Sequence, residues 1–254
     1  DYLSDGKPLN TFVKLKADGA YNINKVKNNY KAGVEWTFSK NYGRGQVYDL
    51  TQPLSASWTT RPRAYKDIPG LHVISAYAEE KLTAPLLGNK VELQAGVRTV
   101  SLPFLDSRYD ISGKIFADPR INMVWHFPTI GVNGLDILVA GGYGVTTKMP
   151  TIDYLFPQSH YDDIIQLNYY DINNPAEYSR VNLRTYINDA TNYNIQPARN
   201  YKWEVRLGME YKGNSLSVTY FSEKMTDGFR YSSTYAPYEY KKYDASAIDA
   251  NSLT

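Results

Sequence analysis

One long segment of this sequence combines the residue types that bind sugars or flat chelates. Seven of the chain's 24 tyrosines lie between residues 148 and 200, among many Asn and Asp. Aromatic rings stack on sugar rings and flat chelates, while Asn and Asp supply hydrogen bonds. We predict that this segment binds a ligand, and for each single tyrosine the alternative is packing within a large loop. The candidate binding residues are Tyr154, Tyr161, Tyr169, Tyr170 and Tyr178.

Other arrangements that perform chemistry are not found in the sequence. The chain has no cysteine, which excludes a disulfide framework, a thiolate nucleophile and a cysteine-ligated metal. His72, His126 and His160 are too far apart to form a local metal motif. Glu79 and Glu80 are adjacent, so on a strand they would point to opposite faces and could not share a substrate. We find no nucleophile elbow and no phosphate-binding loop, and we expect no enzyme activity, no metal and no cofactor.

Charge and hydropathy narrow the class of protein further. The chain has 28 Lys plus Arg and 26 Asp plus Glu, a net charge of +2. This balance gives no electrostatic reason to expect a nucleic-acid partner. The mean hydropathy of -0.48 is too low for a bundle of membrane helices. Residues 121–147 carry almost no charge, but their glycines and their period of two argue against a membrane helix.

The elements that must position these residues are β-strands. Apolar and polar residues alternate clearly over 30–39, 91–98, 120–127, 202–212 and 216–220, and more weakly over 11–22, 71–84 and 135–146. Strict alternation is typical of a strand with two different faces, so we predict about eight strands. The polar column carries charges in the middle of strands. The mid-strand Glu and Arg residues of this column are Glu92, Arg98, Arg120, Glu204, Arg206 and Glu210.

The connections between these strands fall into two length classes. Short ones near residues 23–27, 87–89, 128–134 and 212–215 alternate with long ones over 41–70, 103–114, 148–200 and from 231 onward. This alternation predicts an up-and-down antiparallel sheet with tight turns at one end and long loops at the other. We predict a type II′ turn at residues 212–215 with the glycine first. Asn174-Pro175 predicts the start of a short helix within the longest loop.

Glycines recur in the polar column of three strands. The pattern polar, apolar, Gly, apolar, charged is centred on Gly33, Gly96 and Gly208. A missing side chain there eases sheet curvature or leaves room for a group packed inside.

Alternation alone does not distinguish a soluble sandwich from a membrane barrel. The apolar column includes Trp36, Phe38, Trp125, Phe127 and Trp203, with aromatic residues concentrated near segment ends. Aromatic girdles of this kind are typical of a transmembrane barrel. The charged residues of the polar column fit a polar lumen lined with ion pairs, and they also fit the solvated face of a sandwich.

The order of short motifs over some 200 residues resembles the C-terminal part of the barrel of TonB-dependent outer-membrane receptors. The motifs are AGVE at 32–35, RP at 61–62, SAYAEE at 75–80, LQAGVR at 93–98, DPRI at 118–121, GYGV at 142–145, MPT at 149–151, LF at 155–156, QP at 196–197, YKWEV at 201–205 and LSVTYF at 216–221. The resemblance implies an antiparallel up-and-down transmembrane β-barrel in the bacterial outer membrane, with residues 1–254 as part of its wall and long extracellular loops. The six charged residues of the polar column would then face the lumen.

This resemblance also implies a function and a set of partners. Members of the family import a scarce nutrient, and we expect a glycan or an iron chelate as the ligand. The expected partners are outer-membrane lipid, a plug domain, the TonB protein and a surface lipoprotein. No plug, no TonB-engaging segment and no C-terminal strand ending in an aromatic residue is recognisable, so we expect a fragment that does not close a barrel alone. The alternatives are a soluble or surface-attached β-sandwich that binds carbohydrate, and an outer-membrane barrel enzyme.

Overall fold

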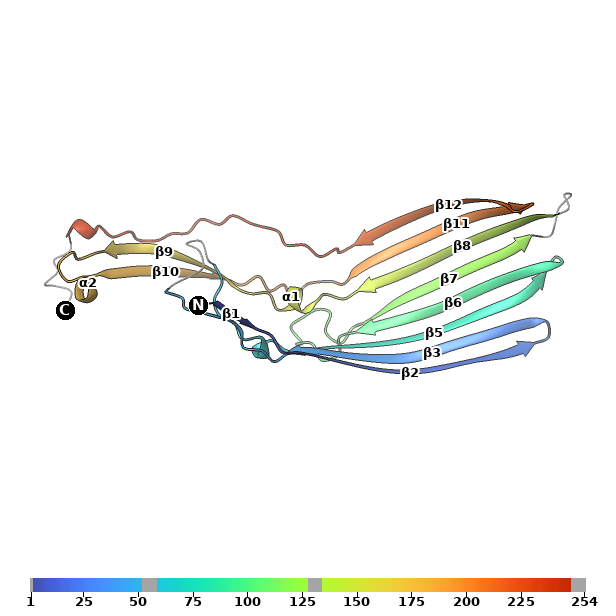
Figure 1. Cartoon of the computed structure of the whole chain (residues 1–254), viewed down its shortest axis with the longest axis horizontal. Helices are drawn as coiled ribbons and strands as arrows, with labels where there is room; N and C mark the ends of the chain where they lie inside the picture. The colour runs from blue at the N-terminus through green and yellow to red at the C-terminus, as the bar shows by residue number, and fades with distance from the viewer. Residues whose placement is uncertain (1, 52–58, 128–133, 248–254) are drawn as a thin grey trace.

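An open antiparallel sheet of eight strands dominates the computed structural model, which describes residues 2–51, 59–127 and 134–247. Each strand pairs with its neighbours in chain order, so the sheet is an up-and-down meander (Figure 1). The expected all-β class and the eight strands are confirmed. The strands are β2 (Pro8–Ile23), β3 (Val26–Asn41), β5 (Leu71–Leu86), β6 (Asn89–Ser101), β7 (Ile115–Phe127), β8 (Leu135–Lys148), β11 (Ala198–Tyr211) and β12 (Asn214–Thr226).

The sheet does not close into a barrel within the described residues. Its edge strands, β2 and β12, each pair with one neighbour only, β3 and β11 respectively. An unpaired edge presents a row of free backbone N–H and C=O groups, to which another strand can be added.

Two further strand pairs lie outside the large sheet. β1 (Tyr2–Asp5) pairs with β4 (Gly45–Tyr48), and β9 (His160–Tyr169) pairs with β10 (Arg180–Asn188). The β9–β10 hairpin projects far from the sheet, and the chain after β12 runs back alongside it (Figure 1). The sequence analysis treated residues 148–200 as one long loop and did not predict this hairpin.

Short helices complete the described chain. They are α1 (Ile152–Leu155), α2 (Pro175–Tyr178) and the 3₁₀ turns η1 (Tyr65–Asp67) and η2 (Ala245–Ala247). The predicted helix start at Asn174-Pro175 is confirmed, with the proline in the first turn of α2, although the Asn174 side chain makes no capping hydrogen bond. Among the described helices, none has both the length and the apolar character needed to cross a membrane.

Tight turns lie at one end of the sheet, which we call the turn end, and the long connections leave from the opposite loop end (Figure 1). The predicted division into short and long connections is confirmed for the described residues, and residues 128–133 lie outside them. The predicted type II′ turn is wrong. Tyr211 pairs with Asn214, so Lys212 and Gly213 form the loop, and both have positive φ (51° and 80°). Positive φ at both positions defines a type I′ turn, in which the glycine stands second.

The strand register divides the sheet into an apolar face and a polar face. Trp203 lies opposite Tyr143 on β8, while Lys202 lies opposite Gly144. The same alternation continues across the sheet without a register shift in the described pairs. The apolar face is not covered by a second described sheet, and many of its residues are exposed, such as Leu15 (72%).

Glycines of the polar face make room for neighbouring side chains, as their position in the polar column suggested. A Cβ on Gly33 would lie 2.7 Å from the Tyr77 ring and 2.8 Å from the backbone oxygen of Leu15. A Cβ on Gly96 would lie 2.9 Å from the backbone oxygen of Ala78 and 3.1 Å from the Cβ of Glu79. Real Cβ atoms do not approach other atoms so closely, so only glycine fits at these two positions. The neighbouring side chains lie against the glycine backbone.

A small hydrophobic core lies at the loop end of the polar face. Its centre is formed by Leu102, Tyr109, Ile111 and Leu155, which come from two of the long connections. Residues of the sheet, including Leu71, Val73 and Phe116, pack against it. The Tyr109 hydroxyl donates a hydrogen bond to the backbone oxygen of Leu155 and joins the two connections. This core fixes the loops to the sheet.

Candidate functional site

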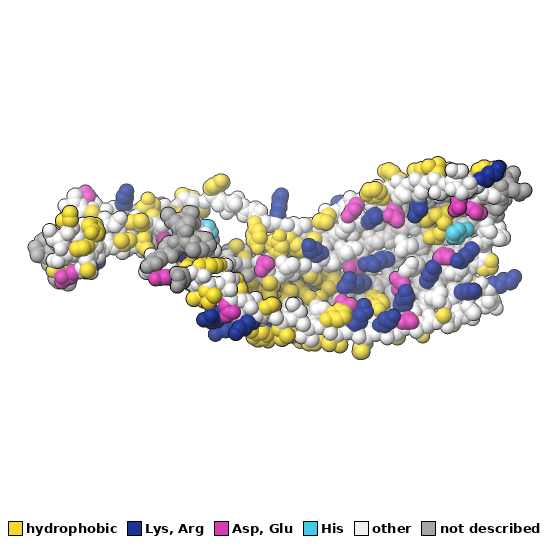
Figure 2. Space-filling model, viewed as in Figure 1, with side chains coloured by type: hydrophobic (Ala, Val, Ile, Leu, Met, Phe, Trp, Pro, Cys, Tyr) yellow, Lys and Arg dark blue, Asp and Glu magenta, His cyan; other side chains and the backbone are white. Residues whose placement is uncertain are grey.

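The charged residues predicted for the polar column share one face of the sheet. The register places Glu92 and Arg98 of β6, Arg120 of β7, and Glu204, Arg206 and Glu210 of β11 on the polar face. Figure 2 shows Lys, Arg, Asp and Glu side chains spread over this face, which is hollowed between the rims formed by β2 and β12. The six residues thus lie on one face of the sheet, and their position in a lumen stays a prediction.

Four carboxylates of the polar face have a cationic partner in the described part of the chain. The Glu92 carboxylate receives the Lys81 ammonium at 2.7 Å and also contacts Lys90. Three further pairs are Lys14–Glu35 (3.4 Å), Lys16–Asp18 (3.0 Å) and Lys202–Glu204 (3.1 Å). Because these side chains are partly or largely exposed, the pairs are weak individually.

Asp118 differs from these four carboxylates, because it is buried and makes no ion pair among the described residues. It is 2% exposed, and it accepts hydrogen bonds from the Thr147 backbone N–H (3.0 Å) and hydroxyl (2.6 Å). Arg98 lies directly across from it in the register, but the Arg98 guanidinium donates to the Ser75 hydroxyl at 3.4 Å instead. Asp118 therefore ties β7 to β8 and leaves Arg98 without a carboxylate.

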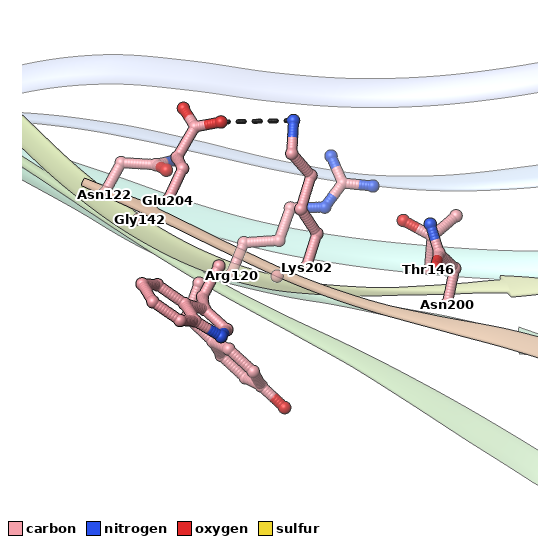
Figure 3. A pocket seen from close by; sticks show the side chains of 10 residues that line it. Arg120, Asn122, Gly142, Thr146, Asn200, Lys202 and Glu204 are labelled. Carbon is pink, nitrogen blue, oxygen red and sulfur yellow. Dashed lines mark ion pairs between the residues drawn. The ribbon is translucent and has the colours of Figure 1, made fainter. Parts of the chain in front are cut away.

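Arg120 stands between two adjoining hollows of the polar face. The first has a volume of about 240 Å³ and the second about 280 Å³, and Arg120 lines both. Figure 3 shows the Arg120 and Lys202 side chains rising side by side from the sheet in the first hollow. Other side chains that line this hollow are Asn122, Thr146, Asn200 and Glu204. The second hollow contains Tyr77, Glu79 and Arg98.

The structure does not bring the five candidate tyrosines into one cleft. Tyr154 lies in α1 at the base of the hairpin, where its ring stacks on Tyr231 with 5.2 Å between centroids. Tyr161 lies at the start of β9 beneath the Arg61 guanidinium, 4.8 Å from the ring centroid. Both rings are thus used to hold segments of the chain together. Whether they also contact a ligand stays a prediction.

The other three tyrosines lie at the far end of the hairpin. The Tyr169 hydroxyl donates to the Asp171 carboxylate at 3.2 Å, and Tyr178 ends α2. Tyr170 is 70% exposed, the most accessible of the five. Asp171 organises this tip by accepting the backbone N–H groups of Asn173 and Asn174. These backbone bonds, above all the one from Asn174, lower the pKa of Asp171.

A polar cluster that the sequence analysis missed fixes the base of the hairpin. Asp163 of β9 accepts hydrogen bonds from the Thr185 hydroxyl (2.6 Å) and from the Arg61 guanidinium. These two donors, Thr185 first, lower the pKa of Asp163 below its usual range. Gln158 donates to the backbone oxygen of Arg61 at 2.8 Å. Arg61 and Asp163 are 102 residues apart, so no local pattern pointed to the pair.

The chain after β12 is attached to the other side of the hairpin. The Tyr238 ring stacks on Tyr186 with 4.3 Å between centroids, and the Tyr238 hydroxyl donates to Asp162 at 2.8 Å. Asn188 also donates to Asp162, at 2.9 Å. Further along, the Tyr243 backbone N–H donates to the backbone oxygen of Gln166 at 2.8 Å.

The three histidines lie in three different surroundings. His72 accepts a hydrogen bond from the Trp36 indole (3.2 Å), and His160 lies 3.1 Å from Asp162. His126 lies on β7 at the turn end. Among the described residues, no group of three or more His, Cys, Asp or Glu side chains could hold a metal ion.

Comparison with known proteins assigns no family to this chain. No protein-family model matches it, and no curated protein matches it. The resemblance to TonB-dependent receptors therefore stays a prediction made from its motifs.

Proposed function

We propose that this chain is part of the β-barrel wall of a TonB-dependent outer-membrane transporter that imports a nutrient. The observation that carries the proposal is the difference between the two faces of the open sheet. The apolar face is left uncovered by the described chain, while the opposite face is charged and concave. A contiguous exposed apolar surface of this extent is typical of contact with a membrane or another protein.

The aromatic residues of the apolar face support contact with lipid. Trp36 and Phe38 lie near the loop end, and Trp125 and Phe127 lie near the turn end, with their rings in contact pairwise. Transmembrane barrels have such aromatic residues on both sides of an apolar band about 25 Å tall. On β11, the stretch from Trp203 to Tyr211 is about 27 Å long at about 3.4 Å per residue, and a tilt of about 40° reduces its height to about 21 Å.

One acidic residue on the apolar face fits the same arrangement. Glu80 lies across from Tyr30 and from Ala95, and the Tyr21 hydroxyl donates to its carboxylate at 2.6 Å. Tyr21 and Tyr30 have their rings near each other, close to the turn end. A carboxylate held among tyrosines is tolerated at the membrane interface, where charged substitutions cost little.

The unpaired edges and the long loops complete the proposal. β2 and β12 would each pair with a further strand of the wall, supplied by the rest of a longer protein. The long loops would face outward and contact the ligand, which we expect to be a glycan or an iron chelate. A plug domain would lie against part of the polar face, and TonB would supply the energy for import, with a surface lipoprotein as a further partner.

Spin labels on adjacent residues of β11 test this proposal. We would place single cysteines at Leu207→Cys on the apolar face and at Arg206→Cys on the polar face, in the full-length protein reconstituted in lipid. We expect the label at 207 to be relaxed mainly by oxygen, which dissolves in lipid, and the label at 206 by a water-soluble nickel chelate.

A second experiment tests transport. Nutrient uptake should be lost in cells that lack a functional TonB protein.

The outcomes separate the proposal from its alternatives. A label at 207 that neither reagent reaches would indicate a second protein layer and favour the carbohydrate-binding sandwich. A label at 207 that the nickel chelate reaches as easily as the label at 206 would place both faces in water. Either result would overturn the lipid-facing assignment.

A further inference from the structure

The polar face carries an arginine without a partner at its centre. Within the described part of the chain, the Arg120 guanidinium makes no hydrogen bond and no ion pair, and its side chain is exposed. Two of the nearby carboxylates are engaged elsewhere, whereas Glu79 lines the second hollow together with Arg120. Glu204 pairs with Lys202, and Asp118 accepts from Thr147. The Arg120 guanidinium is therefore a positive charge that makes no ion pair with a carboxylate of the described chain.

The backbone around Arg120 keeps the guanidinium accessible. Its neighbours in the register are Gly96 on β6 and Gly144 on β8, so no side chain covers it from either adjoining strand. A Cβ at Gly96 would be too close to the backbone of β5, whereas a Cβ at Gly144 would lie 3.7 Å from the Arg120 Cγ. The glycines thus form the floor of the two hollows that meet at Arg120.

A second and a third cation lie beside Arg120. Lys202 stands across Gly144, and Arg98 stands on the neighbouring strand in the second hollow. Figure 3 shows the Arg120 and Lys202 side chains extending in the same direction, with Glu204 as the one carboxylate among the labelled residues. Glu204 pairs with Lys202 and not with Arg120, so a further anion between Arg120 and Lys202 would reduce the repulsion between these two cations.

We propose that the Arg120 cluster, defined as Arg98, Arg120 and Lys202, binds the oxyanion groups of the imported solute. The inference rests on the proposed transport function and narrows its substrate class to acidic solutes. Guanidinium groups bind carboxylate, sulfate and phosphate through two parallel hydrogen bonds, which neutral sugars do not offer. The hollows, of about 240 and 280 Å³, suit one acidic group or one sugar unit each rather than a whole oligosaccharide.

The test uses two probes that differ only in charge. Trigalacturonic acid carries three carboxylates, and its methyl ester is the same sugar without them. We would measure both affinities by calorimetry on the full-length protein, the Arg120→Gln and Arg120→Lys variants, and Arg206→Gln as a control. Arg206 lies on the same face outside both hollows and donates to the Ser217 hydroxyl at 2.9 Å.

We expect the acid to bind at least tenfold more tightly than the ester, since a charge-assisted bidentate pair contributes more than a neutral hydrogen bond. Arg120→Gln should remove most of that preference, Arg120→Lys should restore part of it, and Arg206→Gln should leave it unchanged. Equal binding of the two probes, no binding of either, or an unchanged preference in Arg120→Gln would overturn the inference.

Chemical labelling tests whether Arg120 is free to bind a solute or is already covered by carboxylates of the protein itself. Phenylglyoxal modifies accessible arginines, and mass spectrometry reports the modification of Arg120. We expect labelling in the free protein and protection by the acid but not by the ester. Arg120 that resists labelling without a probe would be covered by another part of the protein, which would also overturn the inference. The two proposals can fail separately. If the label on the apolar face of β11 is not in lipid but the acid still binds, the transporter proposal is rejected and the anion site is kept.

Discussion

The eight-stranded sheet and the β9–β10 hairpin are both built from antiparallel strands, yet they are held in different ways. In the sheet, continuous backbone pairing runs from β2 to β12 without a register shift among the described pairs. The hairpin has a shift between Asn182 and Leu183, and side chains from distant segments hold it on both sides. The sheet thus owes its form to backbone geometry, and the hairpin owes its position to a few specific contacts.

This difference predicts where single substitutions act. A change in the small core at the loop end should release the loops and leave the sheet intact, because the core joins them through a few buried side chains. A change in an exposed pair on the sheet should have little effect, because the backbone pairing persists without it.

The largest effect is expected for Ile111→Ala in the loop-end core. Ile111 is fully buried, and the change removes apolar contacts and leaves a cavity, which costs about 2 to 5 kcal/mol. Hydrogen exchange on the full-length protein should then accelerate in residues 102–114 and 149–156. Exchange in β6 and β7 should stay slow. Leu216→Ala, on the exposed face of β12, is the matched control and should change neither. Equal acceleration in the strands would mean that the sheet depends on this core.

Sequence periodicity predicted the sheet because its cause is local. Alternation follows from the geometry of a strand with two different surroundings, so β3, β6, β7 and β11 were found with their faces assigned. The six charged residues lie on one face for the same reason. The type I′ turn was missed because one residue of register decides whether Gly213 stands first or second.

The hairpin and its attachments were not predictable in this way. β9 and β10 carry mixed polar and apolar residues on both faces, since different segments cover each side. Arg61–Asp163 and Tyr186–Tyr238 are pairs that only the folded chain brings together. The predicted tyrosines were recognised as a type of residue suited to ligands, but composition gave no information on which of them contact the chain itself. Likewise, Arg120 was assigned to the polar column, and only the register revealed its two glycine neighbours.

A smaller effect, confined to the hairpin, is expected on acidification. The pKa of Asp163 is lowered in the folded chain by the Thr185 hydroxyl and the Arg61 guanidinium. A carboxyl group with a lowered pKa stabilises the fold above its unfolded pKa of about 3.9, and the stabilisation is lost as the pH falls through the lower folded value. Spin labels at Val181→Cys and Leu9→Cys should therefore report a distance distribution that is narrow at pH 6 and broadens as the pH is lowered below about 3.9.

The Asp163→Asn variant separates this contact from other effects of acid. An amide at position 163 does not titrate and bonds Arg61 more weakly. The distance distribution in that variant should be broad at pH 6 already and should change little at pH 3. A distribution in Asp163→Asn that is as narrow as in the unmodified protein at pH 6 would show that the Asp163 contact does not hold the hairpin.

The smallest effect is expected for the Lys16–Asp18 pair of β2. Its side chains are 60% and 52% exposed, so water screens the pair, and Lys16→Gln should leave the free energy of unfolding almost unchanged. Thermal unfolding of the full-length protein measures this change. The result also bears on the polar face as a whole. If the substitution lowers the stability substantially, this pair is shielded from water in the protein under test, because an exposed ion pair contributes little. In that case another part of the protein lies against the polar face at β2. Substitutions of charged residues on this face would then destabilise the protein more than they would on an exposed face.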